Sequence, residues 1–323
     1  MRSAHLIYNP LAGRFPAGPF LDRAVKVLES ADWSVHVGQC YPGHDLADLA
    51  REAVAAKAEA VFVAGGDGSV GPVAGVLAGT RTAMGVLPAG TANVFAQELG
   101  LPRVDWAHWF GVEETAAKLA RGQIRLVDLG ECNRKPFLLW AGVGLDGKVV
   151  NSIEPRDRWE KTFGLLNYAI LTLWTSLDWT GLELRVTSGE RTWEGRFLVA
   201  VASNIRSYAG GLMELAPSAM VDDGQLDFWL ISGGSMVDAV VRVVQVLLGM
   251  HVDSPGVVHF QAAEATFECP YPLPVHLDGE PIALGSFAAF STRRRVLRLL
   301  VPEGMTSRVF SLPDINVPGE STV

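Results

Sequence analysis

The first 123 residues alternate short apolar runs with helix-like stretches, and this alternation constrains the fold more than any other feature. The apolar runs, each closed by Gly, Pro or Asn, are Leu6–Tyr8, Val35–Val37, Ala60–Ala64 and Met84–Leu87. The stretches between them are Phe20–Ser30, Leu46–Lys57 and Val73–Leu77, and the second repeats apolar residues at helical spacing. Strand–helix alternation predicts a mostly parallel sheet covered on both faces. Ligands of such sheets bind at the carboxyl ends of the strands.

After about Gln123 the pattern changes to hairpins. Ile124–Gly130 and Pro136–Ala141 are predicted to be paired strands, and Leu182–Thr187 turns at residues 188–190 into Trp193–Ala202. Further β runs are expected at Leu226–Ile231, Val257–Phe260, Ala265–Glu268, Val275–Leu277, Phe287–Phe290 and Val296–Val301. Helix candidates are Phe163–Leu177 and Val237–Met250, and the apolar residues nearly all round the second predict a buried helix or a dimer contact. The second half therefore predicts a mainly antiparallel sandwich with helical insertions.

Length and charge narrow the function classes. A chain of 323 residues fits two domains, predicted at 1–123 and 124–299, with residues from about 300 to 323 packing back on the first. The net charge of −8 excludes a general basic field for nucleic acid. The one dense basic cluster, Arg293–Arg295 with Arg298, is either a solvated strand face or a contact for anionic headgroups or nucleotide phosphate.

The spacing of the cysteines and the lengths of the apolar runs indicate the cellular compartment in which the protein is expected. Cys40, Cys132 and Cys269 lie far apart, which argues against a zinc site or disulfides and suits a reducing cytosol. The first ten residues are interpreted as a strand ended by Asn-Pro, not as a signal peptide. No apolar run reaches the roughly 20 residues that cross a bilayer. A cytoplasmic protein with peripheral membrane contact is expected.

The segment Ala64–Pro72 is the most informative motif. Its sequence, Ala-Gly-Gly-Asp-Gly-Ser-Val-Gly-Pro, follows an apolar run and opens a helix, with Pro72 suited to a first helical position. Glycines permit close backbone approach, and successive amides at a helix N-terminus form a phosphate cradle. Any strand-to-helix turn can be glycine-rich, so the motif alone leaves a structural interpretation open. The G-x-G-x-x-G from Gly66 to Gly71 lacks the acidic residue expected about 20 positions later, which opposes a dinucleotide-binding dehydrogenase.

Two further loops are expected at the same edge of the sheet. Leu87–Ala96 holds Gly90, Thr91 and Asn93, where the Thr91 hydroxyl either caps the next helix or binds nucleotide together with the Asn93 amide. Asn9 and Pro10 end the first strand. Three such loops at one edge of the sheet indicate a nucleotide-binding site more strongly than any one of them alone.

The second half carries two groups of carboxylates. Leu277-Asp278-Gly279-Glu280 ends a strand, and strand alternation would put His276 and Asp278 on one face. Met220–Asp227 combines carboxylates with a tight glycine turn, which suits a hard cation held by oxygen ligands. An ordinary Asp-Gly turn and an acidic turn before a strand are the structural alternatives.

Together these segments resemble the diacylglycerol kinase catalytic-domain family, the bacterial lipid kinases related to sphingosine and ceramide kinases. The resemblance covers most of the chain in the family's order, from Asn9-Pro10 through the Gly-Gly-Asp-Gly loop to Asp278-Gly279-Glu280. It also includes Pro42-Gly43-His44, Pro88–Asn93, Val127–Gly130 and Ala216–Asp227. The Gly-Gly-Asp-Gly loop is shared with NAD kinase and phosphofructokinase relatives. The specific part of the resemblance is therefore the full set of motifs in the family's order.

The resemblance implies a Rossmann-like α/β domain followed by an antiparallel β-sandwich, with ATP in the cleft between them. ATP would be held by Asn9, Pro10, Gly65, Gly66, Asp67, Gly68, Ser69, Val70, Gly71, Gly90, Thr91 and Asn93. Asp278 or Glu280 would be the base for a lipid hydroxyl, and a structural Mg²⁺ would lie on Asp223 with the carbonyls of Met220 and Gln225. Asp67 and Asp128 would join a metal–water network.

Three departures and two alternatives accompany this resemblance. Ser69 replaces a frequent Thr, Val94 stands where many members have Asp, and Gln39 replaces a nucleotide-contacting Thr. A kinase for a soluble acceptor such as NAD and a non-catalytic lipid- or nucleotide-binding relative remain open. The apolar stripe of Phe163–Leu177 is either core or lipid-binding surface. The acceptor lipid and a homodimer are not decided by the sequence.

Overall fold

The computed structural model describes residues 1–10, 18–90, 92–102, 110–145, 179–305 and 308–311. The chain divides into two compact units. The first comprises residues 1–129, 221–223 and 294–323, and the second comprises residues 130–220 and 224–293. The helix candidate Phe163–Leu177 lies outside the described residues. No helix in the described ranges is long and apolar enough to cross a membrane.

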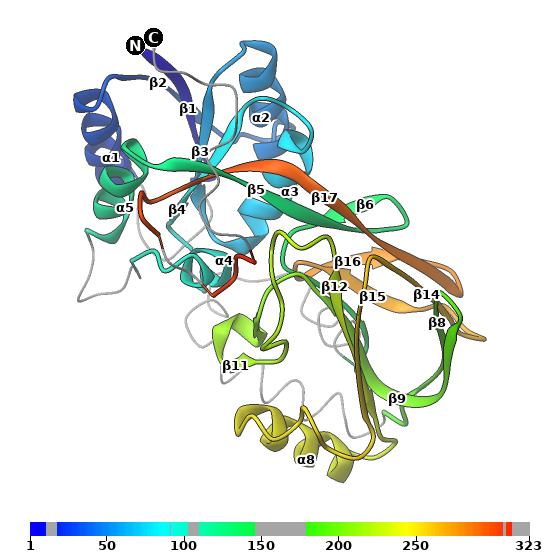
Figure 1. Cartoon of the computed structure of the whole chain (residues 1–323). Helices are drawn as coiled ribbons and strands as arrows, with labels where there is room; N and C mark the ends of the chain where they lie inside the picture. The colour runs from blue at the N-terminus through cyan, green and yellow to red at the C-terminus, as the bar shows by residue number, and fades with distance from the viewer. Residues whose placement is uncertain (11–17, 91, 103–109, 146–178, 306–307, 312–323) are drawn as a thin grey trace. The chain divides into compact units, whose positions relative to one another are not determined.

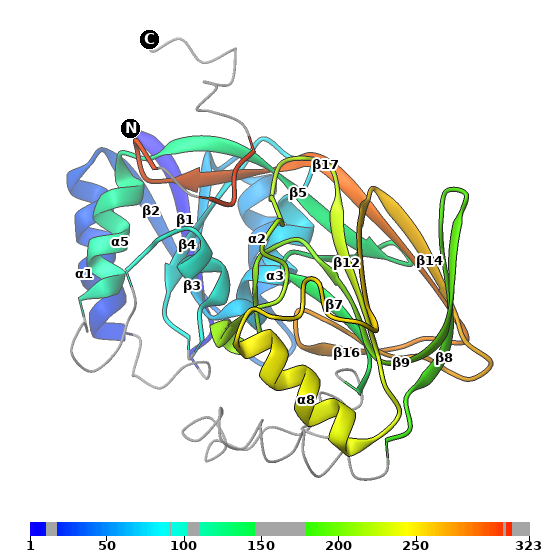
Figure 2. The same ribbon diagram turned by 60° about the horizontal axis from the view of Figure 1, so that its bottom comes forward.

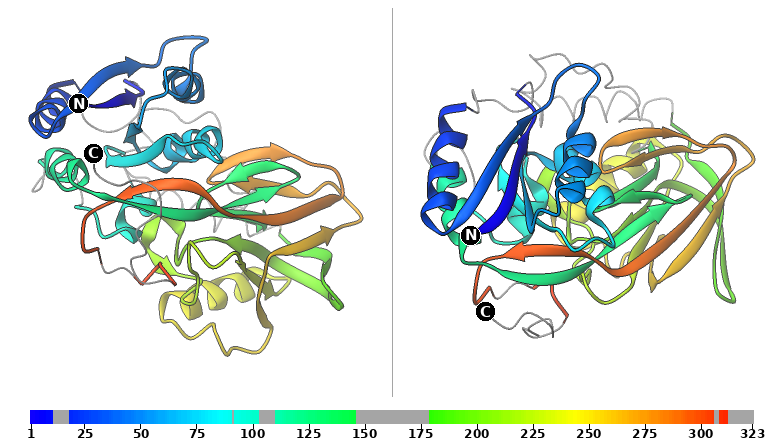
Figure 3. Two further views of the ribbon diagram at one scale, coloured as in Figure 1. Left: turned by 45° about the horizontal axis from the view of Figure 1, so that its top comes forward. Right: turned by 90° about the horizontal axis from the view of Figure 1, so that it is seen from above.

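The first unit contains a parallel sheet in the order β2-β1-β3-β4-β17. Its strands are β1 (Arg2–Tyr8), β2 (Trp33–Gln39), β3 (Ala60–Gly65), β4 (Ala83–Pro88), β5 (Gln123–Cys132) and β17 (Phe287–Val301), the last two continuing into the second unit. Every residue of β3 and β4 is buried, as expected for strands covered on both faces. Figure 3 shows β5 and β17, which pair, running side by side in both views.

Helices cover both faces of this sheet, as the alternation predicted. They are α1 (Gly18–Ser30), α2 (Leu46–Ala55), α3 (Asp67–Leu77), α4 (Val94–Glu98) and α5 (Gly111–Ala120). Figure 1 shows α1 and α5 packed together on one side and α2 and α3 on the other. The apolar spacing of α2 buries Leu46, Leu49, Ala50 and Ala53, and a capping box between Asp45 and Asp48 fixes its start.

Three local expectations in or beside this unit were wrong. Helix α3 begins at Asp67, six residues before Val73, because Gly66 takes the extended N-cap conformation. Pro72 therefore lies inside the helix and not at its first position, and its ring removes the bond that residue 72 would donate to the Gly68 carbonyl. Residues 287–290 and 296–301 are not two strands but one, because β17 runs through the arginine cluster, where Arg295 has φ 51°.

The second unit is antiparallel throughout its paired strands. Its elements are β6 (Lys135–Phe137), β7 (Trp140–Gly144), β8 (Leu182–Ser188), β9 (Arg191–Ser203), β10 (Ser207–Tyr208), η1 (Ala209–Gly211), β11 (Met213–Glu214), β12 (Leu226–Ser232), α8 (Met236–Leu247), β13 (Val257–Ala262), β14 (Glu264–Glu268), β15 (Pro274–Leu277) and β16 (Glu280–Ala283). Strand neighbours run β16-β15-β7-β9-β8-β14-β17, and β12 joins β9 to β13. The β8–β9 hairpin turns at Gly189 and Glu190, as predicted.

Residues 136–141 are not one strand. β6 pairs with β5, whereas β7 pairs with β9 and β15. The chain bends at Leu138 and Leu139, between the two strands.

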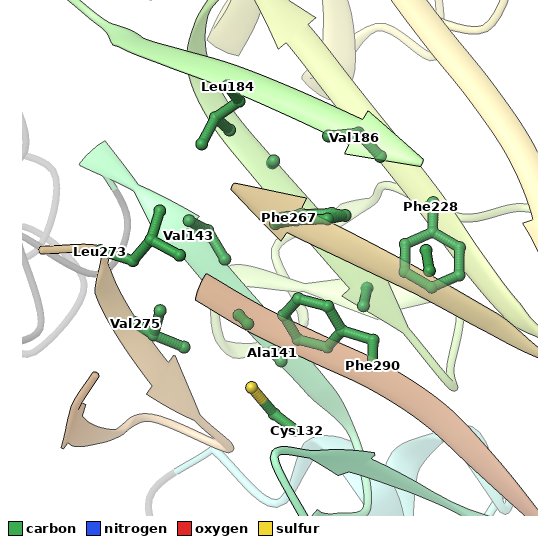
Figure 4. Close-up of a cluster of buried hydrophobic side chains, with 14 of the residues drawn as sticks. Cys132, Ala141, Val143, Leu184, Val186, Phe228, Phe267, Leu273, Val275 and Phe290 are labelled. Carbon is green, nitrogen blue, oxygen red and sulfur yellow. The ribbon is translucent and has the colours of Figure 1, made fainter. Parts of the chain in front are cut away.

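The core of the second unit is aromatic and aliphatic. Phe267 packs against Phe290 with ring centroids 4.8 Å apart and against Phe228 at 6.0 Å. Figure 4 shows these rings gathered with Leu184 and Val275 from neighbouring strands. Cys132 belongs to this core, where burial raises the pKa of its thiol to about 12, and all three cysteines are free thiols. Cys132 and Cys269 therefore play a packing role in this core.

Helix α8 is not the buried helix that one sequence interpretation allowed. Its solvent side is aliphatic, with exposed Val237, Val240, Val241, Val243, Val244 and Leu247 continuing into Leu248 and Met250. The inward side carries Ala239 and Val246, both buried, and the flank carries Asp238, Arg242 and Gln245. Figure 2 shows this helix in yellow. An ordinary surface helix has the reverse arrangement, with charged residues outside.

Candidate active site

The predicted loops lie at the carboxyl edge of the parallel sheet. Register pairs Tyr8 with Ala64 and Gly65 with Pro88, so the segments that follow β1, β3 and β4 leave the sheet side by side. Asn9 and Pro10 follow β1 directly. Thr91 lies outside the described residues.

The two glycine-rich loops touch through their backbones. The Ala89 N–H donates to the Gly65 carbonyl at 3.1 Å. A Cβ atom at Gly90 would lie 2.3 Å from the Gly66 Cα, so only glycine fits there. The Asn93 side chain closes the second loop, accepting from the Gly90 N–H at 2.8 Å and donating to the Gly90 carbonyl at 2.9 Å. Asn93 therefore shapes the loop, and its αL backbone, φ 54°, suits Asn.

Asp67 joins the first loop to helix α4. Its two carboxylate oxygens accept the N–H groups of Val94 at 2.9 Å and Phe95 at 3.0 Å. The N-cap residue of α4 is Asn93, and the carboxylate of Asp67 supplies the cap from another helix. Burial raises the pKa of Asp67, and the backbone N–H bonds oppose that rise. Both carboxylate oxygens of Asp67 therefore bind backbone N–H groups of the protein.

The N-terminus of α3 supplies amides for an anion. The N–H groups of Ser69 and Val70 already donate to the Gly66 carbonyl, at 2.9 and 3.2 Å. The side chains of Ser69 and Val70, and Gly71 itself, are buried. The part of the loop that faces solvent is Gly66–Gly68, with Gly68 exposed. Backbone amides at a helix N-terminus suit phosphate.

Asp128 on β5 is fully buried. Its carboxylate accepts the Arg295 N–H at 2.6 Å, and its own N–H donates to the Val221 carbonyl at 2.6 Å. Asp128 therefore ties β5 to β17 and to the 221–223 loop.

Asp278 lies in a tight turn of the second unit. Asp278 and Gly279 have φ of 50° and 85° and join Leu277 to Glu280, as in a type I′ hairpin. The Asp278 carboxylate accepts three backbone N–H groups, from Leu138 at 2.7 Å, Leu139 at 2.8 Å and Trp140 at 3.1 Å. These three bonds hold the Asp278 carboxylate in place against residues 138–140.

The expectation that His276 and Asp278 share a strand face was wrong. β15 ends at Leu277, and the left-handed backbone of Asp278 breaks the alternation. His276 is buried, and its Nδ1 accepts the Gly279 N–H at 3.2 Å. Glu280 begins β16 with an exposed side chain.

Sequence reasoning missed the group that holds Asp278. Residues 138–140 act through backbone amides, which leave no side-chain signature. Asn204 supports them: it is buried, its side chain donates to the Leu138 carbonyl at 2.9 Å, and its N–H donates to the Leu139 carbonyl at 2.8 Å. A polar Asn directly after the apolar β9 was the available signal.

The proposed cation ligands Met220, Asp223 and Gln225 lie on one short stretch, where Gly224 turns the chain with φ 82°. Asp223 is half-buried, whereas its neighbour Asp222 is buried. Among the described residues no three His, Cys, Asp or Glu side chains could hold a metal together. One carboxylate with backbone carbonyls nevertheless fits a hard cation, which takes oxygen ligands and keeps several waters.

The diacylglycerol kinase catalytic domain matches residues 3–132, and the YegS C-terminal NAD kinase beta sandwich-like domain matches residues 141–301. A Chromohalobacter salexigens protein named "probable lipid kinase YegS-like" is 31% identical, over 91% of this chain and 92% of its own. The chain belongs to the diacylglycerol kinase family.

Other proteins similar to this chain are also named diacylglycerol kinases. The diacylglycerol kinase of Mycobacterium tuberculosis is 31% identical over 85% of this chain and 92% of its own. The crystal structure of a diacylglycerol kinase from Bacillus anthracis has a TM-score of 0.72 and 20% identity, covering 94% and 98% of the two chains. That likeness shows the fold. The glycine-rich loops fall in the region matched by the catalytic domain, and the 220–225 and 278–280 segments fall in the region matched by the sandwich domain.

Proposed function

We propose that this protein is an ATP- and Mg²⁺-dependent lipid kinase that transfers the γ-phosphate to a hydroxyl of a diacylglycerol-like or sphingoid lipid. The observation that carries the proposal is the pair of glycine-rich loops, packed together and locked by Asp67, in a member of the diacylglycerol kinase family. The names of several relatives, diacylglycerol kinase and lipid kinase, support the same class of reaction.

The residues that we propose to bind the nucleotide lie in the first unit. The amides of Gly66–Gly68 at the N-terminus of α3 are proposed to bind ATP phosphates, which the helix dipole also favours. Gly90 and Asn93 hold the second loop against the first, and Asn9, Pro10 and Thr91 are proposed to complete the nucleotide contacts. Ser69, Val70 and Gly71 act by fixing the helix start, because they are buried in it.

The cation role belongs to Asp223, with the carbonyls of Met220 and Gln225. A structural Mg²⁺ held there by oxygen ligands would stabilise the turn. The phosphoryl transfer itself needs metal ions that neutralise phosphate oxygens. The residues themselves provide the oxygen ligands and the tight turn at Gly224 that gathers them.

We assign the base to Glu280 and a positioning role to Asp278. Three backbone N–H groups hold the Asp278 carboxylate in place, so it fixes the turn that leads into Glu280. A carboxylate that takes the proton of an alcohol contributes roughly 10²–10⁴-fold to such a transfer. The Glu280 side chain is exposed and can meet an incoming hydroxyl.

The lipid acceptor is proposed to be met at a membrane surface. The aliphatic outer side of α8 supports this, because its exposed side chains, such as Val240, Val244 and Leu247, are uncharged and the charged Asp238 and Arg242 lie on its flank. A homodimer through the same side is the competing occupant, and vesicle binding and oligomeric state separate the two.

The experiment is transfer of labelled phosphate from ATP and Mg²⁺ to detergent-dispersed diacylglycerol, monoacylglycerol, phosphatidylglycerol, ceramide and sphingosine, with NAD as a control acceptor. Label in one lipid supports the proposal and names the acceptor. Label only in NAD would move the activity to a soluble acceptor. ATP binding without transfer to any of these would favour a non-catalytic relative.

A further inference from the structure

Three residues near the C-terminus hold the loop that carries the proposed cation ligand. Residues 221–223 belong to the first compact unit, although their sequence neighbours on both sides belong to the second. The Val221 N–H donates to the Val309 carbonyl at 2.8 Å, and the Asp128 N–H donates to the Val221 carbonyl at 2.6 Å. The loop is therefore anchored between β5 and the segment Val309–Ser311, called here the 309–311 segment.

Asp222 is the centre of this anchor. Its side chain is buried, and its Oδ1 accepts the Ser311 N–H at 2.6 Å. The Arg125 guanidinium lies 3.8 Å from its Oδ2, and the Arg295 Nε donates to its main-chain carbonyl at 3.2 Å. A buried carboxylate needs such partners, because an unpaired buried charge is strongly destabilising.

The 309–311 segment is itself fixed by packing. Val309 is buried, and the Phe310 ring lies 4.5 Å below the Arg125 guanidinium carbon. All three residues of the segment thus contact the loop or the arginine that pairs with it. Neither Phe310 nor Ser311 belongs to any motif in the sequence.

We propose that the 309–311 segment is a positioning element for the proposed cation site. Asp222 and Asp223 are adjacent, and holding the first fixes the backbone from which the second presents its carboxylate. Preorganised ligands bind more tightly because less ordering accompanies binding. The inference rests on the proposed cation role of Asp223, and its first readout does not require a metal.

The test compares two truncated proteins. One ends after Ser311 and keeps the segment, while the other ends after Arg308 and lacks it. Amide hydrogen exchange of residues 221–225 is measured without metal. Mg²⁺ affinity is then measured from the concentration dependence of thermal stabilisation by Mg²⁺ alone. Loss of a buried hydrogen bond to a charged group predicts at least about tenfold faster exchange and about tenfold weaker Mg²⁺ binding in the shorter protein. The longer protein should match the full chain.

A milder variant covers the case in which the shorter protein fails to fold. Phe310→Ala removes the ring over Arg125 and leaves the backbone bonds, with an expected change of about threefold in both readouts. Equal exchange and equal Mg²⁺ affinity with and without the segment would overturn the inference. If Asp223→Asn and the unchanged protein respond identically to Mg²⁺, the proposed cation site is wrong, and the exchange data alone then decide whether the segment holds the loop.

Discussion

The carboxylate of Asp67 caps helix α4, accepting the N–H groups of Val94 and Phe95 at 2.9 and 3.0 Å. One acidic residue in the first glycine-rich loop thereby fixes the start of the helix that follows the second. Both loops become one rigid edge of the sheet. Rigid backbone amides are what phosphate recognition requires, since the amides must already point at the ligand.

The Asp67 cap predicts a pH-dependent stability difference. Burial raises the pKa of Asp67 above its ordinary value of 3.8, so the folded state holds the proton more tightly than the unfolded state. The free energy of unfolding should therefore fall as pH rises from about 3.8 through the raised pKa. Asp67→Asn lacks this titration but loses one acceptor for α4. Urea unfolding of both proteins at pH 4 and pH 7 should show the unchanged protein losing its advantage over the variant as pH rises. An advantage that grows with pH would contradict the account.

The contact between the glycine loops predicts that Gly90→Ala is costly. An added Cβ would overlap the Gly66 Cα, so the loops must separate. We expect a loss of about 1–3 kcal/mol in stability and at least a tenfold loss in ATP affinity, measured by denaturant unfolding and calorimetry. Gly285→Ala is the matched control, because a Cβ there meets nothing within 4 Å. Equal ATP affinity in the two variants would show that the contact between the loops does not contribute to ATP binding.

The turn at residues 278–280 predicts two different kinetic effects. Glu280→Gln should lower kcat by roughly 10²–10⁴-fold while ATP still binds, because it removes the proposed base. Asp278→Asn should also abolish turnover with ATP still bound, but it loses an acceptor for the amides of residues 138–140 and should lower stability by about 1–3 kcal/mol. Normal turnover by Glu280→Gln would show that another group acts as the base.

The outer side of α8 predicts membrane contact. Lysine at Val240 or Val244, which are 45% and 47% exposed, should weaken sedimentation with lipid vesicles without changing stability. Val37→Lys is the matched control, since Val37 on β2 is 47% exposed and outside α8. If vesicle binding is unchanged while light scattering shows a dimer that Val240→Lys separates, the face is a protein contact.

The sequence predicted the architecture because its signals are local. Apolar runs and turn residues are encoded in consecutive positions, and helix α2 and the β8–β9 turn follow from them. The site depends on contacts distant in sequence. The partners of Asp67 lie 27 and 28 residues away, and those of Asp278 lie about 140 residues away and are backbone amides. No periodicity or motif encodes such pairs, so the roles of Asp67, residues 138–140 and Asn204 emerged only from the structure.

The central claim is phosphoryl transfer from ATP to a lipid hydroxyl, and its most direct measurement is stoichiometry. The purified protein is incubated with ATP, Mg²⁺ and a detergent-dispersed mixture of the lipids named above, and ADP and organic-phase phosphate monoester are quantified together. The account predicts one lipid phosphate for each ADP, and formation of both products slowed by roughly 10²–10⁴-fold in Glu280→Gln. ADP release without lipid phosphate, or bound ATP that is never turned over, would contradict it.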